Sequence, residues 1–213
     1  MKAKIIIPLF LVVGTLLSCN LVESIISPKK LGGTQSTIGA TDNTFSFSGI
    51  TGASGFTSKV ESLENGVTSI SASTTLTDSK IIQMAKSLPD LTWDGNKVSV
   101  TRKYHITSQG IQNVYGDEYF TLVKYDDSVG DSYSAKVNGN TVTRTITSKS
   151  TADDYPYGFY NIKVMKVEET GRGIPGVSKI EYFTNHKFGL VAVNVIFEDG
   201  SSKKITVYSK NEN

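Results

Sequence analysis

Cysteine is almost absent from this sequence, and Cys19 is the only one among 213 residues. A single thiol excludes an internal disulfide, so the folded part must be held together by its apolar core. A domain of about 150 residues buries roughly 68–70% of its unfolded surface, which is enough for such a core. The 19 glycines and ten tyrosines favour strands joined by turns.

Metal ligands are scarce as well. The chain has two histidines, His105 and His186, whereas zinc sites take three or four ligands from His, Cys and carboxylates. Asp126, Asp127 and Asp131 fall in one predicted loop and are the calcium candidates, because calcium prefers carboxylate oxygens. Aspartate also initiates turns without any ion, and this spacing matches no EF-hand. We therefore expect no metal and no other cofactor.

An excess of charge of one sign is also missing. The chain has 22 basic and 20 acidic residues. Lys2 and Lys4 lie in the first 18 residues, which hold no acid, so the remainder is balanced. Nucleic-acid-binding proteins usually carry a basic patch, and the densest basic pairs here are Lys29-Lys30 and Lys203-Lys204. We expect no nucleic-acid partner.

One long apolar run is present, at residues 5–17, and it follows the positive residues Lys2 and Lys4. A charged start, an apolar stretch of about 7–15 residues and a small residue such as Ser18 are typical of a secretory signal. The run is too short to span a bilayer, which needs about 20 apolar residues. Residues 1–18 are therefore predicted to be a cleaved export signal.

The quartet Leu16-Leu17-Ser18-Cys19 resembles the lipobox of bacterial lipoproteins, although Leu17 stands where a smaller residue is usual. The resemblance implies cleavage before Cys19, whose sulfur would carry diacylglycerol with acyl chains such as palmitate. The partner of this end is then a membrane. Asn20 follows, not the aspartate that retains enterobacterial lipoproteins at the inner membrane. We therefore expect residence in the cell envelope, at the outer rather than the inner membrane.

The remaining chain divides near residue 44. Residues 20–43 are rich in Ser, Thr and Gly and lack sustained alternation of apolar and polar residues, which is typical of a mobile linker. After residue 44 the apolar residues recur with a period of two. The predicted organisation is a signal peptide at 1–18, a lipidated flexible tether at 19–43 and a single β-rich domain at 44–213.

Alternation is clearest at residues 97–107, where Val98, Val100 and Tyr104 share one face and His105 lies on the polar face. Residues 190–197 are apolar on both faces, which predicts a covered central strand.

Asn-Gly and Asp-Gly pairs separate several strand-like segments, and such pairs supply the positive φ angles of tight hairpin turns. They predict hairpins at about 56–76, 132–148 and 189–208.

A single helix is predicted at about 78–88. Asp78 can cap it, Pro89 ends it, and an apolar stripe runs along one face. That stripe consists of Ile81, Ile82, Ala85 and Leu88. The fold class that follows is mainly β, an antiparallel sandwich or an open half-barrel with one helix.

Two short motifs resemble catalytic or nucleotide-binding signatures. Residues 171–176 match GxGxxG, but the dinucleotide site needs a helix there, and residues 177–184 predict a strand. Gly130-Asp131-Ser132 resembles the start of an esterase signature, yet its Asp-x-x-His partner is missing. Both are interpreted as turns, and no catalytic residue is expected.

The stretch 153–160 is the most unusual part of the chain because it gathers acids and aromatics around Pro156 and Gly158. Exposed aromatics beside carboxylates suit a binding loop, since functional residues favour loops. A loop folded over the end of the core is the alternative. The candidate binding residues are Asp153, Asp154, Tyr155, Tyr157, Phe159 and Tyr160.

These patterns predict a lipid-anchored cell-envelope protein with a non-enzymatic structural or binding role. One alternative is a carrier or receptor for an apolar ligand, since the element count resembles half-barrel lipoprotein carriers. Another is a surface module that binds a glycan or an envelope protein partner. A hydrolase ranks lowest because no nucleophile–base set stands out.

Overall fold

The computed structural model describes residues 22–26, 29–49, 51–79, 82, 85–86, 91–137 and 139–213. The predicted export signal at 1–18 and Cys19 lie outside these residues. So do several residues of the predicted helix, among them Ile81 and Leu88.

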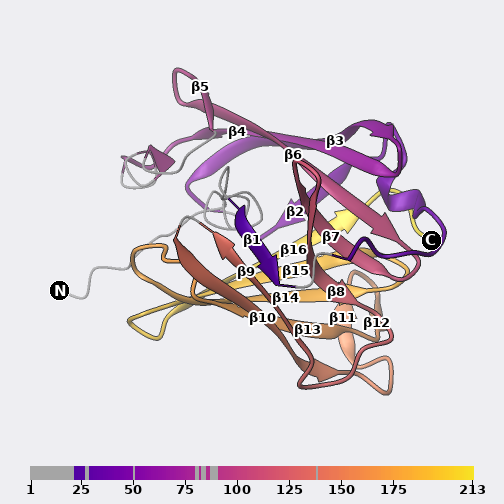
Figure 1. The fold of residues 1–213 in the computed structure, drawn as a ribbon. Helices are drawn as coiled ribbons and strands as arrows, with labels where there is room; N and C mark the ends of the chain where they lie inside the picture. Colours follow the sequence, from indigo (N-terminus) through magenta and orange to yellow (C-terminus); the bar gives the residue numbers. More distant parts are fainter. Residues whose placement is uncertain are drawn as a thin grey trace.

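Two antiparallel sheets dominate the described chain (Figure 1). The eight-stranded sheet has, in spatial order, β1 (Val22–Ile26), β9 (Ser132–Val137), β10 (Asn140–Lys149), β13 (Met165–Thr170), β14 (Val177–Asn185), β15 (Gly189–Phe197), β16 (Ser202–Ser209) and β2 (Phe45–Ser48). The six-stranded sheet has β3 (Ala53–Glu64), β4 (Val67–Leu76), β6 (Lys97–Thr107), β7 (Gly110–Tyr115) and β8 (Glu118–Lys124), with β5 (Thr92–Asp94) paired to β6. A small hairpin of β11 (Tyr155–Tyr157) and β12 (Tyr160–Ile162) and the 3₁₀ turn η1 (Thr37–Gly39) complete the fold.

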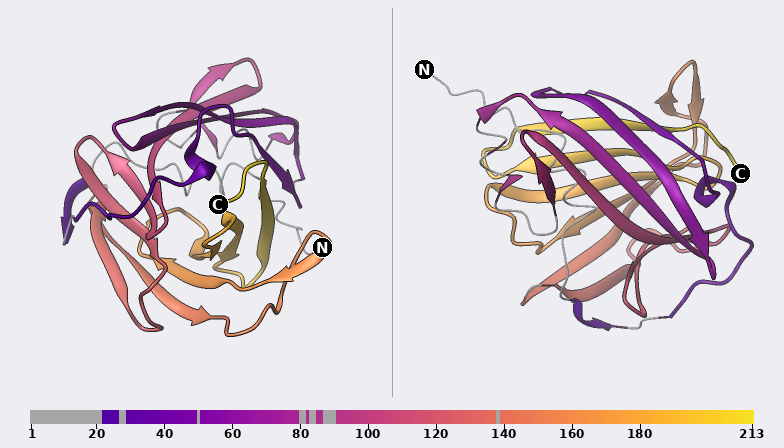
Figure 2. Two further views of the ribbon diagram at one scale, coloured as in Figure 1. Left: turned by 90° about the vertical axis from the view of Figure 1, so that its right-hand side faces the viewer. Right: turned by 90° about the horizontal axis from the view of Figure 1, so that it is seen from above.

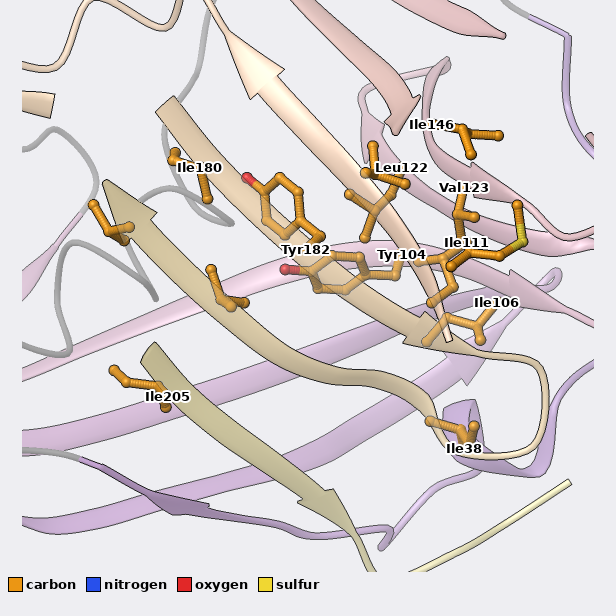
Figure 3. Packing of buried hydrophobic residues seen from close by; sticks show 14 of the residues in the cluster. Ile38, Tyr104, Ile106, Ile111, Leu122, Val123, Ile146, Ile180, Tyr182 and Ile205 are labelled. Atoms are coloured by element: carbon orange, nitrogen blue, oxygen red, sulfur yellow. The ribbon is translucent and has the colours of Figure 1, made fainter. Parts of the chain in front are cut away.

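The two sheets lie face to face, and their inward side chains form one core. Figure 2 shows the purple and magenta strands curving over one side of this core and the orange and yellow strands over the other. Tyr104 and Leu122 enter it from the six-stranded sheet, and Ile180, Tyr182 and Ile205 enter from the eight-stranded sheet (Figure 3). The prediction of a mainly β, antiparallel fold is confirmed, and its sandwich form is the one observed.

The sheets meet along two seams. At one seam Phe120 of β8 packs on Ala135 and Val137 of β9. At the other, the edge strands β2 and β3 are joined at one end, where the amide of Val60 donates to the carbonyl of Asn43 over 2.8 Å. This second seam lies beside the cavity described below.

The three predicted hairpins are confirmed as β3–β4, β9–β10 and β15–β16. Asn65 and Gly66 both have positive φ, 52° and 77°, which is why an Asn-Gly pair suits the first turn. Strand β15 lies between β14 and β16 and is buried along most of its length, so the predicted central strand is confirmed.

Helical hydrogen bonding is present in the described part of the segment predicted at about 78–88. The amide of Ile82 donates to the carbonyl of Asp78, and the amide of Lys86 donates to that of Ile82, each over 3.0 Å. Ala85 is buried, and Ile82 packs beside it on a small cluster with Leu76.

Residues within the predicted tether at 19–43 belong to the folded domain instead. Strand β1 pairs with β9, and the chain from residue 29 onward runs along β6. The amide of Ser36 donates to the carbonyl of Ile106 over 3.0 Å, and Ile38 is only 3% exposed within the core. These contacts join residues far apart in sequence, so the local composition does not reveal them.

His105 is buried, although alternation places it on a polar face. Its Nδ1 lies 2.7 Å from the carbonyl oxygen of Gly66, and its Nε2 lies 2.8 Å from that of Leu31. Residues 29–36 cover this face of β6, which explains why the burial pattern stops alternating after Tyr104.

Candidate functional site

An apolar cavity of about 100 Å³ lies between the two sheets beside the β2–β3 seam. We call it the inter-sheet cavity. Its walls are almost entirely apolar, and Ser58 and Tyr104 are the lining residues that carry a side-chain hydroxyl. It is lined by Ile38, Phe45, Phe47, Phe56, Ser58, Ile70, Ala72, Tyr104, Ile106, Ile111, Leu122, Gly189, Leu190 and Val207.

Small residues at facing positions account for this space. Ser58 on β3, Ala72 on β4 and Gly189 at the start of β15 leave room that larger side chains would fill. Gly189 has a φ of +70°, and a Cβ there would lie 3.1 Å from Cδ1 of Ile38. A larger residue is therefore strained by the positive φ and would also have to displace the Ile38 side chain.

The outer wall of the inter-sheet cavity is aromatic. Phe47 of β2 and Phe56 of β3 meet across the seam with ring centroids 4.1 Å apart, and both are half-buried. Ile82 and Ala85 do not line the cavity, so the described part of the helical segment does not cover it.

The predicted aromatic loop forms the β11–β12 hairpin, which projects from one end of the sandwich (Figure 2, right). Tyr157 anchors it: the ring is buried against Phe188 and Tyr208, and its hydroxyl donates to the carbonyl of Val207 over 3.0 Å. Burial raises the pKa of Tyr157 to about 12. This half of the loop covers the core, as the structural alternative predicts.

A second aromatic pair lies at the base of the same hairpin. Tyr155 stacks on Phe183 at 5.3 Å, and Nζ of Lys204 lies 4.4 Å and 4.6 Å from the two ring centroids. Burial lowers the pKa of Lys204, and the nearby charge of Glu181 opposes that shift only in part.

The tip of the hairpin is exposed. Phe159 is fully exposed after Gly158, and Tyr160 is 51% exposed. Asp153 is exposed as well, whereas Asp154 accepts a hydrogen bond from the Ser150 hydroxyl over 2.7 Å. The six predicted residues are therefore in one region but divide into an anchored half and a free tip.

The calcium candidates are engaged with the protein itself. Asp126 and Asp127 both pair with Nζ of Lys124, at 3.2 Å and 2.8 Å. Asp131 accepts from the amide of Ser128 over 2.8 Å, which closes a turn. Within the described ranges, no three or more His, Cys, Asp or Glu side chains come together as a metal site would require.

The GxGxxG segment is a strand connection, as predicted, and it joins β13 to β14. Gly171 has a φ of +80°, and a Cβ there would lie 2.0 Å from the carbonyl oxygen of Thr141. Close packing against β10 therefore explains this glycine without a nucleotide. The segment lines a second cavity of about 190 Å³, which also borders Glu169 and Arg172.

A buried ion cluster beside this second cavity was not predicted. Arg144 and Glu169 face each other on β10 and β13, with Nε 2.8 Å from the carboxylate, and Arg172 binds the same carboxylate. Burial alone would raise the pKa of Glu169, but the charges and hydrogen bonds of Arg172 and Arg144 outweigh it and hold that pKa low.

No protein-family model and no curated protein matches this chain. One solved structure with similarity is a candidate exported protein with a YmcC-like fold from Bacteroides fragilis NCTC 9343. It has 8% identity and a TM-score of 0.42, over 85% of this chain and 97% of the other. Another is a candidate lipoprotein from Parabacteroides distasonis ATCC 8503, with 8% identity, a TM-score of 0.31, and 81% and 94% coverage.

In the part of the chain that the structure describes, no helix has the length and apolar character required to cross a membrane.

Proposed function

We propose that this protein is a lipid-anchored, non-enzymatic component of the cell envelope that holds a small apolar group in the inter-sheet cavity. The cavity carries the proposal, because its walls are apolar and some of them reach the surface at the β2–β3 seam. A purely structural domain needs no such space, since cores pack to a density of about 0.75. The carrier alternative is therefore favoured over the purely structural role.

The size of the cavity restricts the ligand. A dry engineered cavity of about 150 Å³ lined by Leu, Ile and Phe binds benzene or xenon. The inter-sheet cavity is smaller, at about 100 Å³, so it suits the end of a hydrocarbon chain or a group no larger than one ring. Whole acyl chains are too large for it.

The anchor rests on the N-terminal pattern. A charged start, an apolar run and the lipobox-like Leu16-Leu17-Ser18-Cys19 support export and lipidation of Cys19. Outer-membrane residence rests on Asn20 and belongs to the same proposal. The ligand site would then lie close to a lipid surface, which is a source of apolar chain ends.

Xenon binding tests the cavity directly. We expect a saturable ¹²⁹Xe shift with the full chain, accompanied by changes at the methyl groups of Ile70 and Leu190. Ala72→Phe should fill the space and abolish the shift, whereas Ala152→Phe, in an exposed loop, should leave it intact. Equal xenon shifts in both variants, or wild-type methyl changes far from the cavity, would refute the site. The wild-type methyl measurement stands even where Ala72→Phe folds poorly.

A second candidate function is glycan binding at the hairpin tip. The supporting observation is the fully exposed ring of Phe159 beside Tyr160, with the exposed Asp153 just before the first strand of the same hairpin. Flat rings stack on sugars, and a carboxylate accepts hydrogen bonds from hydroxyls. We expect polysaccharide to retard the full chain in native gels and Phe159→Ser to remove the retardation. Val129→Ser is the control, since Val129 is another exposed apolar loop residue, and equal loss in both variants would contradict this function.

A further inference from the structure

The buried ion cluster has more positive than negative charge. Arg144 and Arg172 share the single carboxylate of Glu169, and their side chains are 0%, 4% and 0% exposed. The other acid of β13, Glu168, alternates to the opposite face and pairs with Lys179 at 2.6 Å. Three ionised groups in the interior therefore leave one net positive charge, and an uncompensated buried charge is strongly unfavourable.

The geometry around Arg144 adds an independent observation. Its Nε donates to Glu169, and its Nη1 donates to the carbonyls of Phe120 and Thr121. Its Nη2 is buried without a hydrogen-bond acceptor, although the guanidinium lies 3.9 Å from the Phe120 ring centroid. Buried donors in native proteins are nearly always hydrogen-bonded, so this N–H group marks a place for an acceptor.

The surroundings also supply space. The second cavity, of about 190 Å³, borders Glu169 and Arg172. That volume is several times the roughly 30 Å³ that one water occupies in the liquid.

We propose that the Arg144–Arg172 pair is a binding site for a small monovalent anion, which enters through the cavity beside the 171–176 connection. One such ion would neutralise the excess charge and supply the acceptor for Nη2 of Arg144. The burial of Arg144 limits the ligand to an ion of about halide size. This site is independent of the inter-sheet cavity and of the lipid anchor.

Thermal unfolding of the full chain tests the proposal, with chloride replacing gluconate at constant ionic strength so that screening stays the same. The unfolding midpoint should rise with the logarithm of the chloride concentration above the dissociation constant, by about 3–6 °C at ten times that constant. Arg172→Met leaves a balanced Arg144–Glu169 pair and should remove this dependence. Arg102→Met removes the remaining arginine, on β6, and should preserve it.

A second measurement uses the wild-type chain alone. Chloride should move the amide ¹H–¹⁵N signals of Gly171 and Gly173, because both residues line the second cavity. A flat wild-type midpoint, the same chloride dependence in Arg172→Met, or amide shifts confined to other regions would each overturn the anion site.

Discussion

Replacing Glu169 by glutamine should destabilise the protein far more than any surface substitution. The change keeps the volume of the side chain, so no void forms, but it removes the only negative charge in the cluster. Glu169 accepts from Nε of Arg144 at 2.8 Å and from Nε and Nη2 of Arg172 at 2.5 Å each. A glutamine would turn its own NH₂ group toward these donors and leave two buried guanidinium groups unneutralised.

The expected loss in free energy of unfolding is about 3–5 kcal/mol, the usual cost of removing one partner of a buried ion pair. For a domain of this size that corresponds to a midpoint lower by about 6–20 °C. Because whole domains are stable by only about 5–15 kcal/mol, such a loss is readily measured.

Urea and thermal unfolding of the full chain, followed by circular dichroism, would measure the effect. Glu61→Gln is the matched control, because Glu61 pairs with Lys59 on the surface and its loss should leave the midpoint unchanged. A loss of less than about 1 kcal/mol for Glu169→Gln would refute the reasoning. It would mean that the buried guanidinium groups of Arg144 and Arg172 do not depend on the carboxylate of Glu169 for neutralisation.

Other predictions concern pH, lipidation and the hairpin. The folded-state pKa of Glu169 lies below its ordinary value of 4.5, so its stabilisation is present above about pH 4.5 and is lost as the pH falls through the lower value. Acid unfolding curves of Glu169→Gln should lack this component. Cys19→Ser should abolish incorporation of labelled fatty acid and retention in membrane fractions, and label in the variant would disprove the anchor. Tyr157→Leu should cost about 2 kcal/mol in urea melts, because a buried hydroxyl bond and ring contacts are lost, whereas Phe159→Ser should cost nothing measurable.

Much of the β architecture could be predicted from local sequence. Alternation at residues 97–107 and the Asn-Gly turn at 65–66 correspond to β6 and to the β3–β4 hairpin. Both signals depend on neighbours within a few residues, which is why they are readable. The chain from residue 29 to 43 was not predictable in this way, since its partners lie on β6 and at Asn213.

The candidate sites differ in how much of each could be predicted from the sequence. Arg144 alternates in phase with the apolar Val142 and Ile146, and Glu169 alternates in phase with Val167. Two opposite charges at inward positions of two strands could therefore have been predicted from the sequence to form a buried ion pair. The inter-sheet cavity gave no such signal, because it depends on small residues from strands that meet only in the folded sandwich. The aromatic hairpin was found from composition, but its division into an anchor and a free tip needed the structure.

The pairing of β2 with β16 has a consequence for the order in which the protein folds. Residues 45–48 find their sheet partners only at residues 206–209, and the side chain of Asn213 accepts from the amide of Thr37. Strand β2 therefore has no sheet partner until the last strand has been made. Contacts of such long sequence separation form slowly, so this edge of the eight-stranded sheet is expected to form last. The seam between β2 and β3, which carries the aromatic wall of the inter-sheet cavity, would then close only after the last strand has been synthesised.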